Sequence, residues 1–238
     1  MEDAVGARIL VVQNTPEGGP QRFGEWLTDA GAALEVVHGY AGAAVPSRPR
    51  HDAVVVLGGG FMPDDEVRAP WLKPTRALVG EAVGRGIPVF GICLGGQLLA
   101  QVAGGTVTAD AGAPELGSVP LTLRAEAGND PLFHGLPRSV PAVQRHVDAV
   151  TALPPGAHWL ARSARCPYQA FRVGSRAWGV QFHPEVPADR LRHWDAESVR
   201  RHGFDPEELH RGAMAAEPAA VRAWRTVARR FARLADGG

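Results

Sequence analysis

The chain has 238 residues with 25 Lys plus Arg and 25 Asp plus Glu, so its net charge is zero, which excludes the basic field expected of a nucleic-acid-binding protein. Hydrophobic residues make up 45% of the chain, enough for a sizeable core, but no stretch is long enough to cross a membrane and the acidic start does not resemble a signal peptide. Two cysteines argue against a disulfide-stabilised fold and fit the reducing cytoplasm, where we expect the protein to reside.

The first hundred residues alternate predicted strands with predicted helices. Apolar, β-branched runs indicate strands, and amphipathic stretches that end near glycine indicate helices. The expected strands are 8–13, 34–38, 52–57 and 89–92, and the expected helices are 21–30, 71–85 and 94–103. Such alternation is typical of a parallel sheet with helices on both faces and all strand C-termini at one edge. We therefore predict an α/β fold with an open, mostly parallel, flavodoxin- or Rossmann-like sheet.

The second half of the chain does not alternate strands and helices in this way. Short β runs separated by Gly and Pro predict an antiparallel extension of the sheet, with strands at 119–123, 159–163, 169–173 and 177–182. Beyond them the chain is predicted to be helical at 188–201, 206–211 and 218–235. No linker rich in Pro, Gly or Ser divides the chain, so we expect residues 1–238 to form a single domain.

Residues 88–97 read Pro-Val-Phe-Gly-Ile-Cys-Leu-Gly-Gly-Gln and place Cys93 on a sharp turn between a predicted strand and a predicted helix. Gly91 and Gly95 flank the cysteine and remove the Cβ atoms that would crowd such a turn. The pattern is that of a nucleophile elbow with cysteine in place of serine. The amide dipoles at the start of the helix favour the reactive thiolate. A lone free cysteine is usually buried and inert, so a reactive role for Cys93 depends on whether the chain also supplies a base.

The partner of this cysteine is predicted ninety residues downstream, where residues 177–185 read Ala-Trp-Gly-Val-Gln-Phe-His-Pro-Glu. His183 and Glu185 are two positions apart, so at strand periodicity their side chains project to the same side. A nucleophilic cysteine needs a base to take its proton and a third group to orient that base. Alone, the tripeptide is more typical of a solvated turn, but together with the elbow it predicts a triad.

Three glycines follow the predicted strand 52–57. They leave backbone amides free to face a ligand, and acyl transfer needs such donors for the developing oxyanion. We assign one donor to Gly59 and Gly60 and the other to the amide of Leu94, directly after the nucleophile. A glycine-rich loop can also hold phosphate, but no Lys-Ser or Lys-Thr pair follows this one.

Together these motifs resemble the class I glutamine amidotransferases, and in particular stand-alone proteins similar to the glutaminase domain of GMP synthase. The resemblance extends over residues 8 to about 235. It implies that Cys93 attacks a γ-carboxamide and forms a γ-glutamyl thioester, with His183 as general base and acid and Glu185 as its partner. The motifs that carry it also include those at 114–117, 130–133, 144–148 and 166–171.

The resemblance also implies a substrate pocket. Gln97 matches the glutamine-binding position four residues after the nucleophile, and His146 and Asp148 lie in the stretch that holds the amino-acid end of the substrate. These last two are equally compatible with the polar surface of a loop. Arg145 stands where the family often has an aromatic residue or serine. Its charge suggests a substrate larger or more anionic than free glutamine.

The expected activity is hydrolysis of glutamine to glutamate and ammonia, with the ammonia passed to a separate synthetase chain. One alternative is a self-sufficient γ-glutamyl hydrolase or peptidase that acts on a γ-glutamyl conjugate. Another is a non-catalytic regulatory relative, which the complete triad opposes. We expect no cofactor, and no metal either, because neither His-Glu-x-x-His nor paired-cysteine spacing occurs. We also expect no nucleic-acid or membrane partner.

Overall fold

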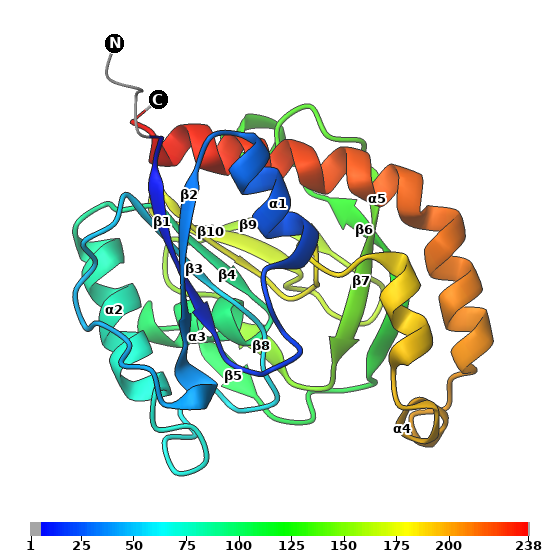
Figure 1. Cartoon of the computed structure of the whole chain (residues 1–238). Coiled ribbons are helices and arrows are strands. Elements are labelled where there is room, and N and C mark those ends of the chain that lie inside the picture. Colours follow the sequence, from blue (N-terminus) through cyan, green and yellow to red (C-terminus); the bar gives the residue numbers. More distant parts are fainter. Residues whose placement is uncertain (1–5, 238) are drawn as a thin grey trace.

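A computed structural model describes residues 6–237, and a nine-stranded sheet runs through the middle of the molecule (Figure 1). The strand order is β2-β1-β3-β4-β11-β10-β9-β6-β7, and a small second sheet pairs β5 with β8. The strands are β1 (Arg8–Gln13), β2 (Ala33–His38), β3 (Ala53–Val56), β4 (Val89–Ile92), β5 (Thr106–Thr108), β6 (Glu115–Leu123), β7 (Ser139–His146), β8 (Ala149–Ala152), β9 (His158–Arg162), β10 (Ala170–Val173) and β11 (Ala177–Val180).

The large sheet has a parallel part and an antiparallel part. Strands β2, β1, β3, β4 and β11 are parallel neighbours, whereas β10, β9, β6 and β7 continue the sheet with antiparallel pairings. Val180 at the end of β11 pairs with Ile92 at the end of β4. The segments that follow these two strands therefore leave the same edge of the sheet side by side, as predicted for an open α/β sheet with an antiparallel extension.

Helices cover both faces of the parallel part. Helices α1 (Gln21–Asp29) and α5 (Pro206–Ala235) pack on one face, and α2 (Leu72–Gly84) and α3 (Leu94–Val102) pack on the other. A hydrophobic core lies on each face of the sheet, and successive side chains of a strand point into the two cores in turn. This is why β3 is apolar at every position. Among the described residues, no helix combines the length and apolarity that crossing a bilayer requires.

Several predicted elements differ from the structure. Strands β5, β7 and β8 were not predicted, because β7 contains proline and polar residues and the other two are three or four residues long. The predicted helix 188–201 is divided into a 3₁₀ segment η3 (Ala188–His193) and helix α4 (Ala196–Arg201). The side chain of Asp195 accepts a hydrogen bond from the amide of Glu197 and so caps α4 as a separate helix.

The predicted break before Pro218 is wrong, because α5 continues from Pro206 to Ala235. A proline inside a helix removes one backbone hydrogen bond and crowds the preceding turn. Figure 1 shows that α5 bends part-way along its length, which is the usual response to an internal proline. Burial of Trp224 and Phe231 against the sheet offsets the local cost.

Candidate functional site

Cys93 lies on the turn between β4 and α3, in a backbone conformation that few non-glycine residues adopt (φ 50°, ψ −107°). The turn depends on its flanking glycines. A Cβ atom on Gly91 would lie 2.3 Å from the carbonyl oxygen of Gly95, and one on Gly95 would lie 2.1 Å from that of Val56. Backbone strain of this kind is concentrated at functional sites. The elbow predicted from the sequence is therefore present.

The cysteine side chain faces a pocket of about 560 Å³ at the edge of the sheet. Cys93 is only 6% exposed, and its backbone amide donates to the carbonyl oxygen of Val180 across 2.8 Å, which ties the elbow to β11. The amides in the first turn of a helix have no partner within the helix. The positive end of α3 therefore lies beside the sulfur, where negative charge is stabilised.

His183 and Glu185 line the same pocket. Nδ1 of His183 is 2.7 Å from Oε1 of Glu185, and the backbone amide of His183 donates to the carbonyl oxygen of Val143 across 2.8 Å. A Cβ atom on Gly58 would lie 3.5 Å from Cβ of Cys93 and 2.9 Å from Cε1 of His183, so the cysteine and the imidazole lie near each other. Two segments distant in sequence, the elbow at Cys93 and the stretch after β11, thus bring a thiol, an imidazole and a carboxylate into one row.

Charge within this row favours the protonated imidazole. Burial opposes a charged ring and lowers its pKa, but the carboxylate of Glu185 and the neighbouring sulfur of Cys93 outweigh burial and raise the pKa of His183 well above its usual value. An imidazolium next to a cysteine stabilises the thiolate. The arrangement therefore suits an ion pair of thiolate and imidazolium.

The three glycines after β3 also line the pocket and lie next to the elbow. A Cβ atom on Gly58 would lie 2.9 Å from Cε1 of His183, and one on Gly59 would lie 2.8 Å from a methyl carbon of Leu94. The backbone of this loop thus approaches the imidazole and the first residue of α3 closely. Gly59 and Gly60, together with Leu94, are therefore where oxyanion donors were expected, and their donor role stays a prediction.

Of the four residues expected to bind substrate, one lines the pocket and three do not. Arg145 lines the pocket, and its guanidinium lies 5.0 Å from the ring centre of Trp194. Gln97 is buried behind the elbow, and its amide nitrogen donates to the carbonyl oxygen of Asp148 across 3.0 Å. His146 faces away from the pocket toward another buried group, and the Asp148 carboxylate accepts from a backbone amide. Neither His146 nor Asp148 is among the residues that line the pocket.

Two residues that sequence reasoning missed hold the segments that carry Cys93 and His183. Gln181 donates from its side-chain amide to Sγ of Cys93 across 3.6 Å. The buried guanidinium of Arg22 donates to the carbonyl oxygen of Pro184 across 2.9 Å and pairs with Glu217 at 2.5 Å. Gln181 shares the alternation of His183, which was an available signal, but nothing local pointed to Arg22.

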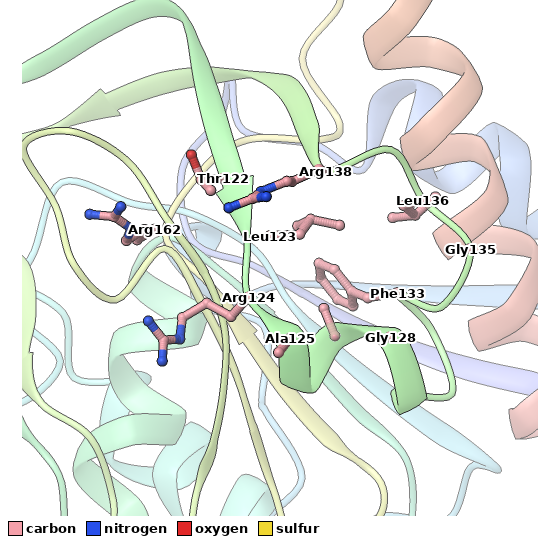
Figure 2. Close-up of a pocket in the computed structure, with 11 residues that line it drawn as sticks. Thr122, Leu123, Arg124, Ala125, Gly128, Phe133, Gly135, Leu136, Arg138 and Arg162 are labelled. Atoms are coloured by element: carbon pink, nitrogen blue, oxygen red, sulfur yellow. The ribbon is translucent and has the colours of Figure 1, made fainter.

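A second cavity, of about 610 Å³, lies between the end of β6 and the 3₁₀ segment η2 (Ala125–Asn129). Figure 2 shows the guanidinium groups of Arg124, Arg138 and Arg162 well apart from one another, with Phe133 among the lining residues. No cysteine or histidine lines this cavity. This cavity therefore offers neither a thiol nor an imidazole, whereas the pocket of Cys93 has both.

Residues 26–193 match the family model described as glutamine amidotransferase class-I. The chain belongs to the class I glutamine amidotransferase family. The family supports an enzyme of glutamine hydrolysis, and it agrees with the resemblance that the motifs indicated.

Two sequence relatives of this amidotransferase carry the name GMP synthase (glutamine-hydrolyzing). The protein from Parafrankia sp. is 39% identical over 153 residues, which is 61% of this chain and 26% of that protein. The protein from Thermococcus kodakarensis, which is named as one subunit of such a synthase, is 46% identical over 101 residues, or 42% of this chain and 52% of that protein. The matches thus span about half or less of the length of these curated relatives.

Two solved structures resemble this amidotransferase over almost its whole length. A glutamine amidotransferase from Thermotoga maritima superposes with a TM-score of 0.84 at 25% identity, over 95% of this chain and 98% of that chain. A glutamine amidotransferase from Methylobacillus flagellatus superposes with a TM-score of 0.83 at 26% identity, over 95% of this chain and 94% of that chain. The fold therefore agrees with the family.

Proposed function

We propose that this amidotransferase hydrolyses glutamine through a γ-glutamyl thioester on Cys93 and passes the ammonia to a separate synthetase chain. The observation that carries the proposal is the row formed by Cys93, His183 and Glu185 along the wall of one pocket. This row contains a nucleophile, a base beside it and a carboxylate that orients the base.

The first half of the reaction forms the thioester. The sulfur of Cys93 attacks the γ-carbonyl carbon of glutamine, and the carbonyl oxygen takes up negative charge. In this proposal the backbone amides of Gly59, Gly60 and Leu94 stabilise the oxyanion, which is supported by the approach of the glycine loop to the first residue of α3. His183 then donates its proton to the departing nitrogen, so that the carbon–nitrogen bond breaks and ammonia leaves.

The second half releases glutamate. With ammonia gone, neutral His183 accepts a proton from a water molecule, which attacks the thioester carbonyl. The second tetrahedral intermediate collapses, the carbon–sulfur bond breaks, and the sulfur regains its pairing with the protonated imidazole. Glu185 stabilises the imidazolium in both halves through the 2.7 Å contact with Nδ1.

A separate acceptor of ammonia is supported by the naming of a relative. The Thermococcus kodakarensis protein is named as one subunit of a GMP synthase, and it is 46% identical to this chain in the matched region. That name implies at least one further chain in the Thermococcus enzyme. By analogy, we propose that a synthetase chain consumes the ammonia released here.

Arg145 supports a second candidate, a γ-glutamyl hydrolase acting on a conjugate. Its guanidinium lies on the pocket wall, and Arg190 and His193 line the same pocket. These groups suit an anionic leaving group larger than ammonia. The thioester chemistry at Cys93 would be the same, with an amine from the conjugate departing in place of ammonia.

The test is release of glutamate by the purified chain from glutamine and from a panel of γ-glutamyl amides. We expect weak glutaminase activity from the chain alone and higher activity when its synthetase partner is added. Cys93→Ala should abolish turnover with an unchanged melting temperature. Full activity in Cys93→Ala would overturn the proposal, and activity confined to the larger conjugates would establish the second candidate.

A further inference from the structure

A second group of cysteine, histidine and glutamate side chains lies outside the pocket. Glu115, His146 and Cys166 each offer a ligand atom, and the three atoms lie within 4.8 Å of one another. They come from the start of β6, the end of β7 and the loop after β9. The side chains of Glu115 and His146 are 2% and 5% exposed, and Cys166 is buried as well. None of the three lines the pocket of Cys93.

The imidazole of His146 is oriented like that of a metal ligand. Its Nδ1 lies 3.2 Å from the backbone carbonyl oxygen of Asp148, which can only accept, so Nδ1 carries the hydrogen. In the neutral ring, Nε2 then has a free lone pair, and this buried atom has no hydrogen-bond partner. Metal-bound histidines have this arrangement, with the other ring nitrogen donating to a carbonyl or carboxylate.

The carboxylate of Glu115 is oriented too. Its Oε2 accepts from Gln169 at 2.6 Å and from Ser163 at 3.0 Å, and Gln169 is itself held by Gln144 at 2.9 Å. Such outer hydrogen bonds hold ligating carboxylates in place. The same Oε2 faces Nε2 of His146 across 3.4 Å. A lone pair and a carboxylate oxygen that face one another at this distance need a cation between them or a proton on the ring.

We propose that Glu115, His146 and Cys166 bind a divalent transition-metal ion, with Zn²⁺ the best fit. Zn²⁺ prefers a tetrahedral set of sulfur, nitrogen and oxygen donors with bonds of about 2.0–2.3 Å, which places ligand atoms roughly 3.5 Å apart. The three atoms reach this spacing with side-chain shifts of about an ångström. A thiolate and a carboxylate neutralise the two charges of the ion, which removes the main cost of burying it.

Binding at this site exchanges a proton for the metal. Burial, together with the nearby carboxylate of Glu115, raises the pKa of the Cys166 thiol to about 12, so the sulfur keeps its proton until the ion arrives. The sulfur–hydrogen bond then breaks, the sulfur–metal bond forms, and the proton goes to solvent.

The test is titration of the full chain with Co²⁺, after metal has been removed with a chelator. We expect one equivalent to bind and to produce a sulfur-to-cobalt charge-transfer absorption, which Zn²⁺ then displaces. Cys166→Ser should remove this absorption. The matched control is Cys93→Ser, which removes the other thiol of the chain and should leave the absorption intact.

A second variant covers the case in which Cys166→Ser does not fold. His146→Gln keeps a polar side chain and should weaken Zn²⁺ binding at least about tenfold, so that added Zn²⁺ raises its melting temperature less than that of the wild type. Absence of stoichiometric binding by the wild type would overturn the proposal. So would a charge-transfer absorption that disappears in Cys93→Ser and persists in Cys166→Ser. Either result leaves the glutaminase proposal unaffected, because the pocket residues are different.

Discussion

The side-chain amide of Gln181 donates to the sulfur of Cys93 across 3.6 Å. The orientation of this amide is set from behind, because its Oε1 accepts from Nε2 of Gln97 at 3.2 Å and Gln97 also donates to the carbonyl oxygen of Asp148. The nitrogen of Gln181 is thereby kept toward the sulfur. A donor that faces a thiolate makes a charge-assisted hydrogen bond, which is stronger than a neutral one.

Gln181→Leu should therefore impair catalysis by removing the hydrogen bond, and the leucine side chain fills the volume of the glutamine without leaving a cavity. A hydrogen bond to a charged group contributes about 1.5–3 kcal/mol, so kcat/KM for glutamine should fall by about 10- to 100-fold. The loss should be in kcat rather than in KM, because the hydrogen bond acts on the sulfur and not on bound glutamine. Gln144→Leu makes the same change at a buried site away from the sulfur and should leave kcat unchanged. An unchanged kcat in Gln181→Leu would assign Gln181 a purely structural role.

Gly58 and Gly60 form a matched pair of tests for the loop after β3. A methyl group on Gly58 would lie 2.9 Å from Cε1 of His183, whereas one on Gly60 meets no atom within 4 Å. Because displacing a catalytic group by about 1 Å costs about a hundredfold, Gly58→Ala should lower kcat by that order. Gly60→Ala should keep most of the activity. The measurement is glutaminase activity of both variants, with melting temperatures to show that both are folded. Equal activities would mean that His183 shifts to accommodate the methyl group without loss of function.

Glu185→Gln should change the pH dependence in a defined direction. The carboxylate raises the pKa of His183 against the effect of burial, and activity that needs the imidazolium is lost as pH rises through that pKa. Removing the charge lowers the pKa, so the alkaline limb should move to lower pH, and kcat should fall by about 10²- to 10⁴-fold.

The control for this change is Glu25→Gln on the exposed face of α1, which should leave the profile unchanged. The measurement is kcat/KM for glutamine across the pH range in which the protein is folded. If the alkaline limb lies at the same pH in Glu185→Gln and the wild type, the charge of Glu185 does not affect the pKa of His183, and this prediction is wrong.

The two cysteines should differ strongly in reactivity. A diazo-ketone analogue of glutamine should alkylate Cys93 and spare Cys166, because the pKa of Cys166 is raised to about 12 by burial and Glu115. At pH 7 only about one Cys166 thiol in 10⁵ is then ionised. Mass spectrometry of the labelled peptides measures the ratio, and Cys93→Ala provides the blank. Similar labelling rates at both positions would mean that Cys93 is not specially activated.

Arg145→Ala should distinguish the two candidate substrates. If the pocket serves an anionic conjugate, kcat/KM for such γ-glutamyl compounds should fall about tenfold or more, as expected for the loss of one ionic hydrogen bond, while turnover of glutamine is retained. Arg138→Ala removes a similar charge outside the Cys93 pocket and is the control. Identical selectivity of Arg145→Ala and the wild type would remove the conjugate hypothesis.

Much of the site was predictable because its geometry is local. The strand that ends at Ile92, the cysteine after it and the glycines at 91 and 95 indicate a tight elbow from local sterics, although Gly95 also makes room for Val56 of β3. The predicted meeting of His183 and Glu185 is confirmed by a 2.7 Å contact, although β11 ends at Val180 and a turn at Pro184 and Glu185, rather than a strand, brings the side chains together.

The orientation of residues that depend on distant partners was not predictable. His146 follows Arg145 on β7, and adjacent strand residues point to opposite faces, so only the register of β7 in the sheet decides that the arginine faces the pocket. The continuation of α5 through Pro218 also depends on distant contacts, since packing of Trp224 and Phe231 outweighs the local preference for a break.

By itself, the sequence indicated the elbow at Cys93, the downstream pair of His183 and Glu185, and the parallel sheet that supports them, since each follows from short-range sterics or spacing. The tertiary structure alone decided that Gln181 faces the sulfur and that Glu115, His146 and Cys166 meet. Contacts between segments far apart in the chain are set by strand register and by the packing of two cores, and no local pattern encodes either.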